Sequence, residues 1–147
     1  MGGLKPIFFQ LCQNSNSMIQ RIQTFYLFAA AIFSALAAFL LPMYVLDGIS
    51  FAATAKASTF GGFGGSMAFF SGAILLYRNR KVQLLIVRLG MLVNLLVLGS
   101  LIMIIQGEGA TASYGVVVPF INVVVAFLAS RGIQKDEAKV RSLDRLR

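Results

Sequence analysis

The sequence has no histidine and no tryptophan, and its only cysteine is Cys12. A single cysteine cannot form a disulfide within the chain. Without histidine, a metal site would need several carboxylates or Cys12, and the chain has only five acidic residues. A nucleophile paired with a base is equally hard to assemble from these residues. We therefore expect no metal, no cofactor and no enzymatic activity.

Charge is also scarce, because charged residues make up 12% of the chain and apolar residues 58%. A soluble domain of 147 residues needs a more polar surface, which excludes an ordinary soluble protein. The net charge of +8 would suit nucleic acid. However, the basic residues gather in short clusters between apolar runs, as they do in the loops of membrane proteins. We therefore expect membrane lipids, and no nucleic acid, as partners.

Four apolar runs cover residues 24–42, 59–77, 82–105 and 114–130. At 1.5 Å per residue, each is long enough to cross roughly 30 Å of hydrocarbon with at most slight thinning. None contains a carboxylate, whereas proton-coupled transporters typically use acids within the membrane. The runs predict an all-α membrane protein over residues 18–130, with four antiparallel transmembrane helices in one bundle.

The basic residues indicate how these spans are oriented. Eleven of them precede span one, follow span four or join spans two and three, and Lys56 alone lies on the opposite side. The positive-inside rule then places both termini and the 78–81 turn in the cytoplasm.

The first 17 residues differ in character from the rest of the chain. Met18 begins MIQRIQTFYL, a short basic head directly before a span, so we predict that the native chain starts there and that residues 1–17 are an extension. A cleaved signal peptide covering span one is the alternative, but its apolar core of about 18 residues exceeds the usual 7–15.

Two asparagines lie near the middle of spans three and four. Asn94 and Asn122 each need a polar partner in hydrocarbon, and a hydrogen bond between them would contribute roughly 0.6–2 kcal/mol. A polar substrate path is the alternative. Pro119, also in span four, predicts a kink, because it removes one backbone hydrogen bond.

Arg88 is the only charged residue within a span. It lies two or three residues inside the predicted boundary of span three, so its side chain can extend to the headgroups and contact a lipid phosphate. The alternative is a buried functional arginine, since an ionisable group inside a membrane is often functional.

Span two is rich in small residues. Gly61, Gly65, Ala68 and Gly72 favour close helix packing and predict that this span lies at the centre of the bundle. The GGFGG stretch lacks the Lys-Ser/Thr pair of a phosphate loop, so we do not interpret it as one.

The tail, residues 131–147, holds six basic and three acidic residues. Ile133, Val140, Leu143 and Leu146 share one helical face, which predicts a short amphipathic cytoplasmic helix. The tail either anchors the topology or docks a partner. The candidate contacts with lipid or a partner are Arg21, Arg78, Arg80, Lys81, Arg88, Lys135, Lys139, Arg141, Arg145 and Arg147.

MIQRIQTFYL at 18–27, YRNRKVQ at 77–83, RL at 88–89 and the closing RGIQKDEAKVRSLDRLR resemble a bacterial family of small four-span inner-membrane proteins, domain of unknown function 4293. The resemblance implies an integral membrane protein with no assigned activity and supplies no catalytic residues.

Two classes of function are compatible with these features. The favoured one is a non-enzymatic accessory or scaffold protein that binds lipid headgroups or a membrane or cytoplasmic protein through its basic face. The alternative is a small transporter or channel, formed as a homo-oligomer, with Asn94, Asn122 and Arg88 lining a path.

Overall fold

The computed structural model describes residues 4–144, and within them the side chains of residues 22–135, 137 and 138. Most of these residues are helical. The helices are α1 (Leu4–Phe39), α2 (Ala57–Leu75), α3 (Arg80–Glu108) and α4 (Val117–Asp144). Each coincides with one predicted span, although α1 and α4 extend well beyond theirs.

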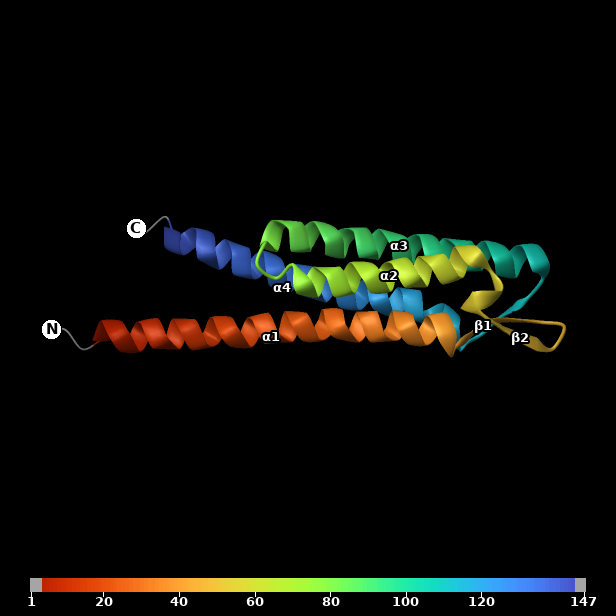
Figure 1. Cartoon of the computed structure of the whole chain (residues 1–147), viewed down its shortest axis with the longest axis horizontal. Helices are drawn as coiled ribbons and strands as arrows, with labels where there is room; N and C mark the ends of the chain where they lie inside the picture. The colour runs from red at the N-terminus through yellow and green to blue at the C-terminus, as the bar shows by residue number, and fades with distance from the viewer. Residues whose placement is uncertain (1–3, 145–147) are drawn as a thin grey trace.

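The four helices lie side by side, and each packs mainly against two neighbours (Figure 1). α1 contacts α2 and α4, and α3 contacts the same two helices. The prediction that span two lies at the centre is therefore wrong. The start of α1, the end of α4 and the short α2–α3 turn lie at one end, which we call the turn end (Figure 1).

The opposite end, which we call the sheet end, carries a three-stranded antiparallel sheet that the apolar runs do not predict. Its strands are β1 (Pro42–Leu46), β2 (Ile49–Ala52) and β3 (Thr111–Ala112), in the order β2-β1-β3. β1 thus joins the connection between α1 and α2 to the connection between α3 and α4. Ser113 N–H adds a bond to Met43 O at 3.1 Å.

The hairpin between β1 and β2 turns at Asp47 and Gly48. Their φ angles are 51° and 80°, and two positive angles are the requirement of a type I′ turn. Asp-Gly between apolar stretches is a strong hairpin signal. The sequence therefore contains the information for this hairpin, although it lies in a stretch whose small and polar residues resemble a loop.

Local features at two helix ends explain where α3 stops and why Pro119 is tolerated in α4. Gly109, with φ 64°, ends α3, and Ala110 N–H bonds back to Ile105 O at 3.0 Å. Pro119 is the third residue of α4, where a backbone N–H would have no partner within the helix. The predicted kink at Pro119 is therefore not required, because the proline lies in the first helical turn.

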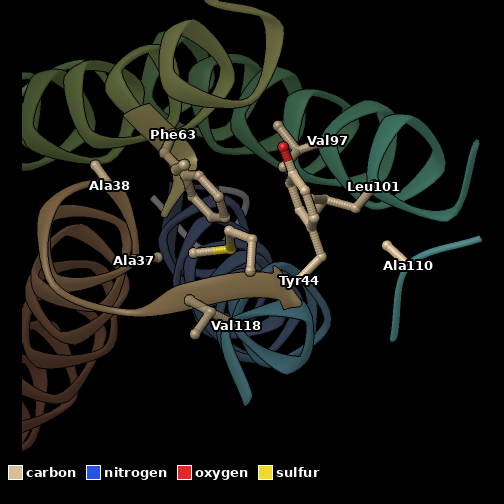
Figure 2. Packing of buried hydrophobic residues seen from close by; sticks show 10 residues of the cluster. Ala37, Ala38, Tyr44, Phe63, Val97, Leu101, Ala110 and Val118 are labelled. Carbon is tan, nitrogen blue, oxygen red and sulfur yellow. The ribbon is translucent and has the colours of Figure 1, made fainter. Parts of the chain in front are cut away.

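Two apolar clusters form the core. One lies at the sheet end, where Tyr44 from β1 points toward Val97 and Leu101 of α3, beside Phe63 of α2 (Figure 2). The other lies toward the turn end and includes Leu27, Phe70, Val87, Ala126 and Ile133.

Three of the four helices are long and apolar enough to cross a membrane. Their apolar windows are Ile22–Phe39, Arg80–Glu108 and Tyr114–Lys135. Large apolar side chains remain exposed along these helices, among them Phe25, Leu96 and Phe120. Such an exposed apolar surface is typical of a protein that faces lipid. By length and composition, these three helices are therefore compatible with a membrane protein. α2 is not among these three helices, and five of its 19 residues are glycines.

Candidate functional site: a buried polar layer and a basic end

A polar layer separates the two apolar clusters, and we define it as Ser34, Ser66, Asn94 and Asn122. Each of the four helices contributes one of these residues, and all four side chains are fully buried. Ser66 and Asn94 are the central residues of α2 and α3. The layer is therefore a polar cross-section through the middle of the packed helices.

Asn122 is the hub of this layer. Its Nδ2 donates to Ser34 Oγ at 2.9 Å and to Asn94 Oδ1 at 3.3 Å. Asn94 Nδ2 in turn donates to Gly90 O at 2.8 Å, and the Ser34 hydroxyl donates to Ala30 O at 2.9 Å. The predicted hydrogen bond between Asn94 and Asn122 is therefore present, and Ser34 of α1 also bonds to Asn122.

Ser66 lies at the same level on α2. A Cβ added to the neighbouring Gly65 would lie 4.0 Å from Val93 Cγ1, so this part of α2 packs against the part of α3 that carries Asn94. Its hydroxyl donates to Gly62 O at 2.9 Å, so its own backbone satisfies it. Ser66 is not among the predicted site residues, because serines are common in helices and this one is not flanked by polar residues.

One acceptor in the layer has no partner: Asn122 Oδ1 is buried and makes no hydrogen bond to the protein. A buried polar group without a partner costs roughly 1–3 kcal/mol. The layer holds only neutral amides and hydroxyls, which do not titrate near neutral pH. It can therefore donate and accept hydrogen bonds, but it cannot store a proton. No group of three or more possible metal-ligating side chains occurs in the part of the chain that the structure describes.

The second feature is the basic end, formed at the turn end by cationic side chains. Arg78, Lys81, Arg88, Arg131 and Lys135 are exposed there, and Arg80 is half-buried. The Arg131 guanidinium lies 4.9 Å from the centre of the Phe127 ring, a distance at which a cation–π contact is favourable.

Arg88 does not join the polar layer. It is exposed on the outer surface of α3, whereas Asn94 faces inward. The structure therefore gives no support to a path lined by Arg88 together with the two asparagines within one chain.

The sheet end has a different charge arrangement. Lys56 forms an exposed ion pair with Glu108, which links the start of α2 to the end of α3. The hydrogen bond to this carboxylate raises the pKa of Lys56 above its ordinary value. Lys56, the one basic residue that the sequence places on this side, is therefore paired with the acidic Glu108.

The packing face of α2 differs from the predicted one. Gly61 and Ala68 are exposed, and a Cβ on Gly61 or Gly72 would meet nothing within 4 Å. Gly62 makes the close approach instead, because a Cβ there would collide with Val97 Cγ2. The reason is that two of the four phenylalanines of α2, Phe63 and Phe70, are fully buried and fix which face turns inward.

The tail continues α4 without a break as far as Asp144. Ile133 is buried in the apolar cluster of the turn end, and Gly132 lies against Gln23 of α1. Lys135 is exposed. The side chains of Arg21, Lys139 and Arg141 lie outside the described residues, as do Arg145 and Arg147 entirely.

Comparison with known proteins supplies the family. The family model described as domain of unknown function 4293 matches residues 19–146, which is most of the chain. The chain belongs to this family. No curated protein and no solved structure matches it. Membership in domain of unknown function 4293 carries no assigned activity, so function has to be argued from the polar layer and the basic end.

Proposed function

We propose that this member of the family is a non-enzymatic accessory protein of a bacterial inner membrane. In this proposal all four helices cross the bilayer as one bundle, and both termini are cytoplasmic. α2 has 19 residues, which give about 28 Å of helix, and it packs against α1 and α3. Its exposed face carries the apolar side chains of Phe60, Met67 and Leu75, which suit contact with lipid. The bacterial inner membrane is inferred from the family resemblance.

The observation that carries the proposal is the separation of charge between the two ends. The turn end exposes cations of α3 and α4 and of the turn before α3, whereas Lys56 at the sheet end is paired with Glu108. Cytoplasmic loops of membrane proteins carry the excess of lysine and arginine. This supports a cytoplasmic turn end with a surface for anionic partners.

The end of α4 is the proposed docking surface. α4 projects beyond the α2–α3 turn (Figure 1), and it continues past Ile133, the last tail residue described in the core. A topology signal needs only a few basic residues. This tail instead spaces apolar residues on one helical face and mixes acids with bases. That pattern favours a protein partner in the membrane or cytoplasm.

Removal of residues 134–147 tests this proposal. We expect the shortened protein to insert in the membrane but to lose a partner that co-purifies with the intact chain in gentle detergent. The matched control replaces the same residues by an alanine-lysine helix of equal length and net charge. Identical partners for the intact, shortened and control proteins would refute the docking role.

Reporter fusions test the orientation. Fusions at Lys56, Asn79 and Arg147 should report periplasm, cytoplasm and cytoplasm, because α2 and α4 each cross the membrane in the proposed arrangement. A periplasmic signal at Arg147, or the same side for Lys56 and Asn79, would contradict four spans with cytoplasmic termini.

A small oligomeric transporter or channel is the second candidate, favoured by one observation, the unpartnered Asn122 Oδ1 in the buried layer. The layer lies between two apolar clusters, so a path through one chain would have to cross both. This candidate requires solute flux by reconstituted protein, and that flux must disappear when Asn94 and Asn122 are replaced by leucine.

A further inference from the structure

One outer face of α3 combines two cations with a row of leucines. Lys81, Leu85, Arg88, Leu92 and Leu96 follow one another at spacings of three and four residues, so they share one side of the helix. All five are exposed, and the leucines strongly so, at 57%, 55% and 73% in chain order. This face is therefore in contact with whatever surrounds the helices.

The two cations lie at the start of this face. Lys81 and Arg88 are seven residues apart, or about 10 Å along the axis. Side chains on a helix lean toward its N-terminus, so Arg88 reaches back toward Lys81 and the turn end. Both groups can therefore approach the same small anion between them.

Within the part of the chain that the structure describes, no ion pair involves Lys81 or Arg88. Arg88 also lies within a helix that is apolar enough to span a membrane. A cation at that depth is costly unless it meets water or an anion. A phosphate at the headgroup boundary would supply that anion.

The leucine row favours a lipid over a free phosphate ion. From Leu85 to Leu96 the helix rises about 16 Å, which matches one leaflet of a hydrocarbon core roughly 30 Å thick. We propose that Lys81 and Arg88 bind the phosphate of one anionic phospholipid whose acyl chain lies along Leu85, Leu92 and Leu96. The site rests on α3 crossing the bilayer and is independent of partner docking by the tail.

Native mass spectrometry of the full chain tests this site. Protein purified in mild detergent is titrated with phosphatidylglycerol and, separately, with phosphatidylcholine. We expect the first adduct of phosphatidylglycerol on the Lys81→Gln/Arg88→Gln variant to be about thirtyfold weaker than on the native chain, from the loss of two well-placed cations. Phosphatidylcholine should bind both proteins weakly and to the same extent.

The matched control is Arg131→Gln/Lys135→Gln, which removes the same charge from exposed positions at the same end on α4. It should change phosphatidylglycerol binding less than threefold. Equal losses in both double variants would show unspecific attraction and overturn the proposal. Complete competition by millimolar inorganic phosphate would overturn it as well, since it would identify a free-anion site.

Two more variants keep the test independent of folding and of the tail. Lys81→Arg/Arg88→Lys keeps both charges and should retain binding within about threefold, so a loss of binding in this variant would overturn a site that depends on the two charges. Removal of residues 134–147 should leave the lipid adduct unchanged. If the tail deletion abolished the adduct while Lys81→Gln/Arg88→Gln did not, the lipid site on α3 would be refuted.

Discussion

At the scale of single residues, Asn122 organises the centre of the molecule. Its amide joins α1, α3 and α4, because its Nδ2 donates to Ser34 and to Asn94. The sequence indicates that the two asparagines need polar partners in an apolar setting, and it predicts that they bond to each other. It cannot indicate that a serine of α1 takes the second bond, because that depends on how the helices are rotated.

Double substitution of the asparagines measures this contribution. We expect Asn94→Leu and Asn122→Leu each to change stability, with a coupling between them of about 0.6 kcal/mol and at most about 1.7. The detergent-solubilised single and double variants are heated, and thermal unfolding is measured as the loss of the monodisperse elution peak. Ser100→Ala, which removes a half-buried hydroxyl of α3 bonded only to its own helix, is the control.

The same variants separate the two candidate functions. For an accessory protein, the substitutions should alter stability and leave partner capture intact. Solute flux that depends on Asn94 and Asn122 would instead favour the transporter.

At the scale of elements, α2 shows how far a pattern of small residues can predict packing. The glycines predict close helix contacts, and one such contact exists, between Gly62 and Val97. The predicted positions Gly61 and Ala68 lie outside. The spacing of small residues alone cannot choose between neighbouring faces, because burial of Phe63 and Phe70 decides the rotation of the helix.

Neighbouring glycines of α2 provide a matched pair of variants. Gly62→Ala should lower the unfolding temperature by several degrees, since its Cβ collides with Val97, whose branched side chain cannot easily rotate away. Gly61→Ala has open space around it and should be neutral or stabilising by up to about 1 kcal/mol.

Val97→Ala provides the rescue. Combined with Gly62→Ala, it should recover part of the lost stability by making room for the new methyl group. If Gly61→Ala proved more harmful than Gly62→Ala, the observed rotation of α2 would be wrong.

The sheet shows why short elements are harder to predict than helices. The helices follow from long apolar runs, which composition alone reveals. β3 has two residues and carries no periodic signal, so only its pairing with β1 makes it a strand. The turn at Asp47 and Gly48 is the one local signal available for this part of the fold.

At the scale of the whole molecule, charge and apolarity are distributed along one long axis. The cations at the turn end, the apolar outer surface between the ends and the few charged residues at the sheet end follow one another in that order. The sequence predicts this distribution, because it depends only on which residues fall between the runs. It cannot predict that Arg88 faces outward or that Lys56 meets Glu108, since both depend on how the helices rotate and pack.

The central position of β1 in the sheet also has a consequence for the order in which the chain is completed. One edge of β1 pairs with β2 a few residues later, but the other pairs with residues 111–112, which are synthesised only after the whole of α3. A nascent chain that has reached the middle of α3 therefore carries an unpaired strand edge outside its first helices. Because an open edge is where foreign strands attach, we expect the outer edge of β1 to be exposed to such pairing until residues 111–112 are available.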